Sequence, residues 1–391
     1  MPEEWGELLI ELKKMPRGVE SAPQYLRHLM KMFVADFEMS VSKRLDMKYW
    51  SKLKKMMDEM RKASENDRVV DLNVQNLAMG FMTELALLVD CHYEIPSFGQ
   101  DISPHLRWNS LVYSDRKPVK SKKNCRVFMA YILLRIGDLM RYKDCLPKAR
   151  ELYEQSCRIN PADGAVWNQL GLTSVLSAQY LESVYFHTRA LHASLEFPSA
   201  TGSLTTIFKK FANRGISKSM PVNELYLSCL AKIHFLLEIE NSETLLETIS
   251  EKLATSKEMI VSLMSVYEHL EDGTELEQRA VAYISSIWTI SYRILLETLA
   301  KRIEESEDEP EISNLLHLLT FFHKEGTEFN TSTEQASSNN SSPLKSTSRS
   351  PVKAQRREDP ESSDEEILQR GRRRGRAPRL NESNDTDDEL F

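Results

Sequence analysis

A repeat of 34 residues near the middle of the chain limits its possible folds more than any other feature. In a frame that begins at residue 130, the matched positions of the two copies are Leu133, Ile136, Gly137, Ala149 and Tyr153, then Trp167, Leu170, Gly171, Ser183 and His187. The small residues let two helices pack closely, and Pro161 would end the second helix of the first copy. Two such copies predict stacked helical hairpins, which need further helices on both sides to bury their faces.

This pattern resembles the tetratricopeptide repeat (TPR), with hairpins expected over 130–197. Helical periodicity continues through the first 325 residues, whereas alternating runs of β-branched residues with tight-turn signals are nearly absent. The chain is therefore predicted to be all-α. Helices are expected over 3–13, 22–65, 69–92, 124–142, 145–159, 163–177, 180–194, 202–211, 221–239, 242–270, 274–305 and 310–324.

The composition argues against catalysis. The chain has a formal net charge of −7 and 41% hydrophobic and 28% charged residues, which is typical of helix-rich soluble proteins. Its five cysteines never form a CxxC pair, and HExxH, GxSxG, P-loop and GxGxxG motifs are missing. We therefore predict no enzyme activity, no metal site and no cofactor. The longest apolar stretches are interrupted by polar residues, so no membrane partner is expected.

A stripe of lysines is the first candidate binding feature. On a helix, Lys48, Lys52, Lys55 and Lys62 share one face, while Trp50, Leu53, Met57 and Met60 share the opposite face. Such a stripe could grip a dianionic phosphate. The alternative is an ordinary solvated face in which Glu59 pairs with Lys55 at i,i+4.

The second candidate lies in the first repeat. Asp138, Arg141 and Tyr142 fall at positions 9, 12 and 13 of the frame, and Asn168 falls at position 5 of the next copy. In TPR proteins these positions face the concave side, where ligands bind. An arginine offers a planar fork of donors that suits phosphate. The alternative is a local pair between Asp138 and Arg141 at i,i+3.

Several segments together resemble one known family, the SMG and ever-shorter-telomeres proteins. These segments are Tyr49-Trp50, Leu134–Tyr142, Tyr153, Asn160-Pro161, Trp167–Leu170 and Ala190–Ala200. The resemblance implies a 14-3-3-like domain of TPR hairpins over 1–215 and a helical hairpin domain over 216–325. It is greatest for members without a PIN nuclease domain.

The resemblance also implies a function, that of an adaptor in nonsense-mediated mRNA decay. Such an adaptor binds phosphorylated Ser or Thr of the up-frameshift RNA helicase, pairs with a paralogous SMG protein, and promotes dephosphorylation of the helicase by a Ser/Thr phosphatase. The family's phosphate-binding positions fall on Lys55 and Arg141, with Tyr142, Lys62 and Asn168 beside them. Both Lys55 and Arg141 are then expected to be exposed. The implied location is the cytoplasm, with shuttling to the nucleus.

The composition changes near residue 326. Phe329 and Phe391 are the only aromatic residues beyond it, so 326–391 is predicted to be a disordered, charged tail rich in Ser and Arg. The basic run Arg370–Arg379 leaves nucleic-acid binding open. Two alternatives to the adaptor therefore remain, a telomerase-associated RNA-binding factor and a TPR scaffold that binds peptides without regard to phosphate.

Overall fold

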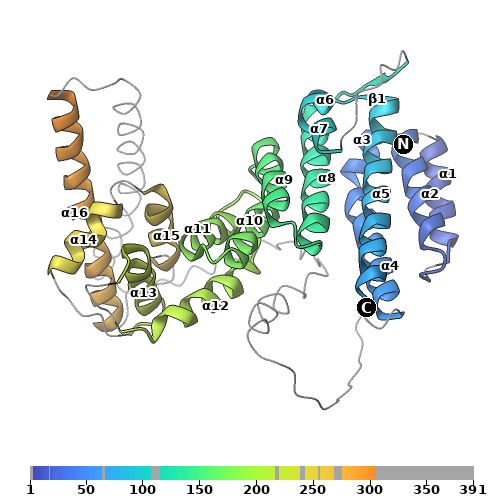
Figure 1. Ribbon diagram of the computed structural model, residues 1–391. Coiled ribbons are helices and arrows are strands. Elements are labelled where there is room, and N and C mark those ends of the chain that lie inside the picture. The colour runs from blue at the N-terminus through green and yellow to red at the C-terminus, as the bar shows by residue number, and fades with distance from the viewer. Residues whose placement is uncertain are drawn as a thin grey trace, which may run out of the picture. The chain divides into compact units, whose positions relative to one another are not determined.

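The computed structural model describes residues 3–16, 18–63, 67–106, 115–215, 220–237, 243–253, 256–267 and 275–304. Within these residues the chain is all-α apart from one short parallel pair of strands, β1 (Tyr93–Glu94) and β2 (Lys117–Pro118), so the predicted fold class is confirmed (Figure 1). The helix predicted over 310–324 and the predicted tail over 326–391 lie outside the described residues.

The helices before the repeat surround one core (Figure 1). They are α1 (Glu3–Lys14), α2 (Ala22–Ala35), α3 (Phe37–Ser42), α4 (Leu45–Ala63), α5 (Arg68–His92), α6 (Phe98–Asp101) and α7 (Ser103–Leu106). Trp5 is buried at one edge of this core and donates a hydrogen bond to the Ser40 hydroxyl over 3.0 Å. Tyr49 is also fully buried, and its hydroxyl donates to the Phe81 carbonyl over 2.9 Å, which joins α4 to α5.

The single helix expected over 22–65 is wrong, because this segment forms the three helices α2, α3 and α4. Asp36 stops α2 with an extended backbone and caps α3, since its carboxylate accepts from the Met39 amide over 2.9 Å. Arg44 separates α3 from α4 with a left-handed φ of 53°. The helix therefore breaks at Asp36, because the short carboxylate side chain binds a backbone amide that a continuous helix would use. The helix expected over 242–270 is likewise divided, into α14 (Glu243–Leu253) and α15 (Lys257–Tyr267).

The repeat forms two helical hairpins, as predicted. They consist of α8 (Lys122–Tyr142), α9 (Leu146–Ile159), α10 (Gly164–Leu176) and α11 (Tyr180–Leu191). A Cβ atom at Gly137 would lie only 2.5 Å from the Tyr153 ring, and one at Gly171 only 2.7 Å from the His187 ring. Glycine is thus required at position 8 of each copy, because a ring of the facing helix fills the space that any larger side chain would need.

The remaining described helices share a second core with α11. They are α12 (Ala200–Ala212), α13 (Val222–His234), α14, α15 and α16 (Glu275–Glu304). This core includes Phe208 before residue 215 and Tyr226 after it, and the Tyr226 hydroxyl donates to the Met259 carbonyl over 2.6 Å. Packing is therefore continuous across 215, and the division into domains at 215 and 325 stays a prediction.

Helix α5 differs from the sequence expectation in its apolarity. It is long and apolar enough to cross a membrane by length and composition, with a mean hydropathy of 1.2 over 18 residues, of which 44% are buried. The expectation that no such stretch exists is therefore wrong for α5. Ala78, Leu85 and Val89 place one face of the helix in the first core, whereas Val69, Leu72 and Leu77 are exposed.

Candidate phosphate-binding site

The lysine face of α4 is exposed, as its spacing predicted. The Lys55 side chain is 65% exposed and lies 4.0 Å from Glu59, and Lys62 is also exposed. The opposite face carries Trp50, Leu53 and Met57, all buried. Lys55 and Lys62 are two turns apart on one face, about 10.5 Å along the helix.

Lys52, between them, is engaged elsewhere. Its ammonium donates to the Gly18 carbonyl over 3.0 Å and lies 5.3 Å from the centre of the Tyr25 ring. Burial lowers the pKa of Lys52, and the nearby charge of Lys55 lowers it further. Lys55 and Lys62, which are both exposed, are therefore better placed than Lys52 to meet an anion.

Arg141 is not exposed, and that expectation is wrong. It is only 6% exposed, because its guanidinium is directed into the interface of α8 with α9. There its Nε donates to the Tyr153 hydroxyl over 3.3 Å, and its Nη2 lies 3.6 Å from Asp138 Oδ1. Burial alone would lower the pKa of Arg141, but Tyr153, Tyr142 and Asp138 raise it, so the group stays charged. The local pair of Asp138 with Arg141, the alternative reading of the sequence, is present.

Asp138 is shared between two arginines, which the sequence analysis did not foresee. Its Oδ2 accepts from Arg135 Nη1 over 2.9 Å, and its Oδ1 accepts from the Tyr153 hydroxyl over 2.8 Å. Arg135 is 3% exposed and lies 4.8 Å from the centre of the Tyr131 ring. Two guanidinium groups thus share one carboxylate in a poorly solvated place, where charge acts strongly.

Tyr142 joins this buried cluster to the end of the lysine face. Its ring lies 4.9 Å from the Arg141 guanidinium and 5.6 Å from that of Arg61 on α4. Arg61 pairs with Asp71 of α5, and the neighbouring Lys62 is exposed. The structure therefore brings together the last turns of α4 and α8, where Arg61 and Arg141 both contact the Tyr142 ring and Lys62 follows Arg61 in the chain.

Asn168 does not face a groove, so its predicted orientation is wrong. It is 1% exposed, because α10 is covered by both α9 and α11, and its Oδ1 lies 3.0 Å from His187 Nδ1. Burial lowers the pKa of His187 to about 3, so the ring is neutral near pH 7. Asn168 and His187 form a link between α10 and α11, inside the second hairpin.

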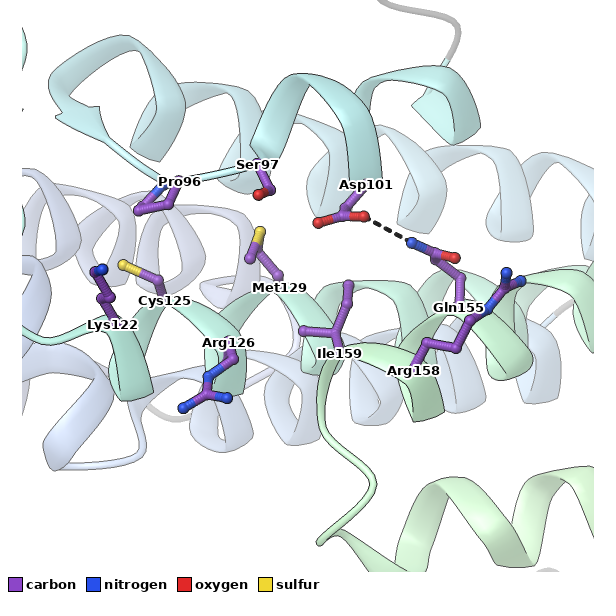
Figure 2. A pocket seen from close by; sticks show the side chains of 10 residues that line it. All are labelled: Pro96, Ser97, Asp101, Lys122, Cys125, Arg126, Met129, Gln155, Arg158 and Ile159. Atoms are coloured by element: carbon purple, nitrogen blue, oxygen red, sulfur yellow. Dashed lines mark hydrogen bonds between the residues drawn. The ribbon is translucent and has the colours of Figure 1, made fainter. Parts of the chain in front are cut away.

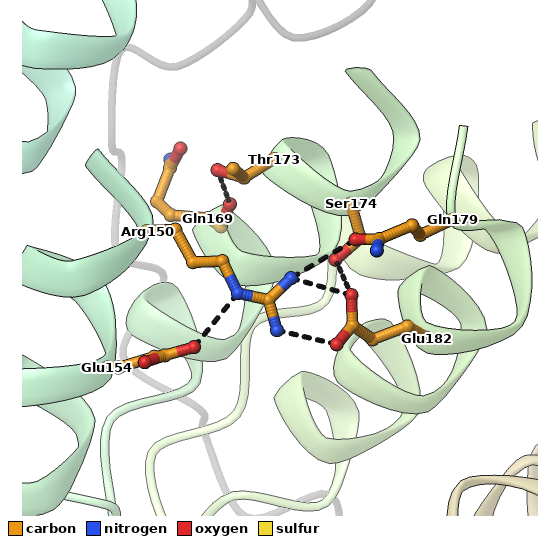
Figure 3. Close-up of polar contacts among 7 residues, drawn as sticks. All are labelled: Arg150, Glu154, Gln169, Thr173, Ser174, Gln179 and Glu182. Atoms are coloured by element: carbon orange, nitrogen blue, oxygen red, sulfur yellow. Dashed lines mark hydrogen bonds and ion pairs between the residues drawn. The ribbon is translucent and has the colours of Figure 1, made fainter. Parts of the chain in front are cut away.

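A further charged cluster, unforeseen as a set, links the two hairpins (Figure 3). Arg150 of α9 donates to Glu182 of α11 over 2.5 and 2.7 Å and to Glu154 over 2.9 Å. Ser174 donates to the same Glu182 over 2.8 Å. The hydrogen bonds that Arg150 donates to Glu182 raise the pKa of Arg150 and lower the pKa of Glu182.

In the described part of the chain, no three His, Cys, Asp or Glu side chains lie close enough together to bind a metal ion. We call Lys55, Arg61 and Lys62 of α4 together with Arg141 and Tyr142 of α8 the α4–α8 group. It offers hydrogen-bond donors and positive charge, and in it Lys55 and Lys62 are exposed whereas Arg141 is buried. Such a set can bind an anion by charge-assisted hydrogen bonds.

Comparison with sequence families gives one match. The model of the Est1 DNA/RNA binding domain matches residues 149–366, more than half of the chain. Among curated proteins, the chain is 23% identical over 241 residues to the nonsense-mediated mRNA decay factor SMG7 of Danio rerio, which covers 57% of this chain and 20% of that protein. It is 24% identical over 147 residues to human SMG5, also named a nonsense-mediated mRNA decay factor, which covers 34% of this chain and 14% of that protein. The chain thus spans a fifth or less of these relatives' length.

Two solved structures are similar to the fold. A chain in the structure of the C. elegans SMG5-SMG7 complex is 67% identical, with a TM-score of 0.79, and the match covers 82% of this chain and 83% of that one. A chain in the crystal structure of Est1 and Cdc13 is 12% identical, with a TM-score of 0.54 over 81% of this chain and 74% of that one. The second likeness concerns the fold alone.

Proposed function

Because this chain belongs to the SMG and ever-shorter-telomeres family, which the Est1 DNA/RNA binding domain defines, we propose that it is an adaptor of nonsense-mediated mRNA decay. The adaptor recruits other proteins and performs no chemistry of its own. The observation that carries this proposal is the 67% identity to a chain of the SMG5-SMG7 complex over most of both chains. The cytoplasm is the proposed place of action, and a Ser/Thr phosphatase is a proposed further partner.

The proposed stable partner is a paralogous SMG protein, and helix α5 is the surface proposed for it. Val69, Leu72 and Leu77 are 65%, 42% and 43% exposed along this helix, an arrangement that exposes apolar surface to water. A Cβ atom at Gly80 would have nothing within 4 Å, so the fold itself gives no reason for glycine there. A glycine in a helix interior costs stability, and close approach by a partner helix would explain it.

The proposed ligand of the α4–α8 group is a phosphoserine or phosphothreonine of the up-frameshift RNA helicase. In this proposal Lys55 and Lys62 contact the phosphate, whereas Arg141 acts from the buried side. Asp138 and Tyr153 hold Arg141, and the Arg141 guanidinium lies against the Tyr142 ring, so its positive charge favours an anion nearby. A phosphoserine supplies about −1.5 to −2 charge and three strong acceptors. Asn168 has no part in this site.

A titration with matched peptides tests the phosphate proposal. A Ser-Gln peptide and its phosphorylated form are titrated against the wild-type chain and against Lys55→Glu/Lys62→Glu, with Lys13→Glu/Lys209→Glu as a control because both of those lysines are exposed on other helices. Each charge-assisted bond contributes about 1.5–3 kcal/mol, so the first variant should lose phosphopeptide binding tenfold or more. Equal binding of both peptides to the wild type would instead support a phosphate-independent scaffold.

A further inference from the structure

A second site lies at the opposite end of α8. A hollow of about 690 Å³ opens between α6, the start of α8 and the end of α9 (Figure 2). Cys125 and Met129, both buried, form its floor with Ile159 beside them. Its volume falls in the range of about 300–1,000 Å³ that is usual for ligand sites. Lys122 lies 20 residues before Tyr142 on one helix, about 30 Å away, so the hollow is separate from the phosphate site.

The wall of the hollow is held in place by a hydrogen bond. Gln155 Nε2 of α9 donates to Asp101 Oδ1 of α6 over 2.8 Å (Figure 2). Ser97, on the same wall, has a left-handed φ of 63°, and its side chain makes no capping hydrogen bond to α6. Such backbone strain is concentrated where a fold presents a side chain to a ligand. The hollow therefore has a fixed wall with one strained, polar residue.

Among the residues that line the hollow, basic side chains outnumber acidic ones. Lys122, Arg126 and Arg158 line it and are exposed. None of the three has a carboxylate within ion-pair distance among the residues that the structure describes. Asp101 is the one acidic residue among those that line the hollow, and Gln155 engages it.

The three cations are spread along the rim. Lys122 and Arg126 are one turn apart, about 6 Å along α8. Arg158 lies at the far side, on α9, and Figure 2 shows the three side chains apart from one another and not converging on one point. This spacing suits an extended chain of negative charges better than a single phosphate.

We propose that this hollow binds an acidic peptide segment of a partner protein, in which one aliphatic or aromatic side chain is flanked by carboxylates. The apolar side chain occupies the floor over Cys125 and Met129, and the carboxylates meet Lys122, Arg126 and Arg158. Nucleic acid fits less well, because single strands are bound by stacking on aromatic rings, and none of the lining residues is aromatic.

The test uses a synthetic peptide. A fluorescent heptapeptide with one leucine between two runs of three Asp and Glu residues is titrated against the full chain, with fluorescence anisotropy as the measurement. We expect saturable binding that weakens as salt is added. Arg126→Glu/Arg158→Glu should weaken it about tenfold or more. Arg293→Glu, an exposed arginine of α16 with a 65% exposed side chain, should bind as the wild type does.

Further arms separate the alternatives. Replacing the leucine of the peptide by serine should weaken binding about tenfold, since a buried aliphatic side chain would be lost. Three outcomes would overturn the proposal: no saturable binding, equal binding by the Arg126→Glu/Arg158→Glu variant, or displacement of the peptide by single-stranded RNA or by the Ser-Gln phosphopeptide. Displacement by the phosphopeptide would place both peptides at the α4–α8 group. If the wild-type chain failed to bind the phosphopeptide but still bound the acidic peptide, only the proposed function would be contradicted.

Discussion

At the scale of single residues, buried polar groups determine what the candidate site can do. The sequence predicted Arg141 as an exposed hydrogen-bond donor to a phosphate, but in the structure Asp138 and Tyr153 already engage its guanidinium. Asn168 looked like its neighbour in a groove, but it is bonded to His187 inside a hairpin. Both residues therefore act through packing. Their substitution tests stability as much as binding, which is why Lys55 and Lys62 carry the binding test.

Asp138→Asn should destabilise the chain by about 3–5 kcal/mol. The change removes the carboxylate that the buried Arg135 and Arg141 share, and breaking a buried ion pair by removing one partner is costly. Urea unfolding measures the loss. Glu297→Gln, at an exposed 3.9 Å pair with Arg293, is the control and should change the free energy of unfolding by less than about 0.5 kcal/mol. A similar small effect at Asp138 would mean that the cluster is open to water.

His187 should make stability depend on pH. Burial lowers its pKa to about 3 in the folded chain, against about 6.5 in the unfolded chain. The unfolded state therefore binds the proton more readily, and stability is lost as pH falls below about 6.5. From this group alone the free energy of unfolding should be about 2 kcal/mol lower at pH 5 than at pH 7.5. Urea unfolding at both pH values should show a drop smaller by that amount in His187→Gln, and an equal drop in both chains would contradict a buried neutral ring.

At the scale of elements, the repeat is visible in the turns as well as in the helices. Asp144 follows α8 and Ala178 follows α10, 34 residues later, and both have a left-handed φ, of 60° and 58°. At Ala178 the Gln179 amide donates to the Ser174 carbonyl over 2.8 Å, the pattern that ends helices at a left-handed residue. Glycine usually occupies this position, so the left-handed turn itself could not be predicted from residue type, although the helix ends were.

Ala178→Gly should stabilise the second hairpin by up to about 1 kcal/mol. The exposed methyl group of Ala178 is held at a φ of 58°, which glycine adopts without strain. Ser177→Gly, one residue earlier at a φ of −91°, is the matched control and should lower stability, because there glycine only adds freedom to the unfolded chain. Thermal unfolding of both variants gives the comparison. Equal melting temperatures would mean that the left-handed residue carries no strain.

At the scale of the whole molecule, the exposed face of α5 is the main unexplained apolar surface of the first core. Leu72→Glu/Leu77→Glu should prevent co-purification with a paralogous SMG protein and leave the melting temperature nearly unchanged, because both side chains are about 40% exposed. Leu176→Glu/Leu195→Glu, at residues 38% and 40% exposed in and after the second hairpin, is the control and should keep the partner. If the α5 variant still co-purified with the partner, the interface would have to lie on another surface of the chain.

The local rules of the chain determined most of the helices by themselves. Periodicity placed α1, α5 and α8–α13 within a few residues of their observed bounds, since each has one apolar face to bury. The repeat also predicted the close helix contacts at Gly137 and Gly171, since both glycines fall at the position of the 34-residue frame where the two helices of a hairpin meet. Tertiary structure alone decided where charge is buried. Tyr153 reaches Asp138 and Arg141 only when α8 and α9 pack, and Tyr142 reaches Arg61 only when the ends of α4 and α8 come together. Contacts between distant segments cost loop entropy and depend on the shape of the whole core, so no spacing along the chain can show them.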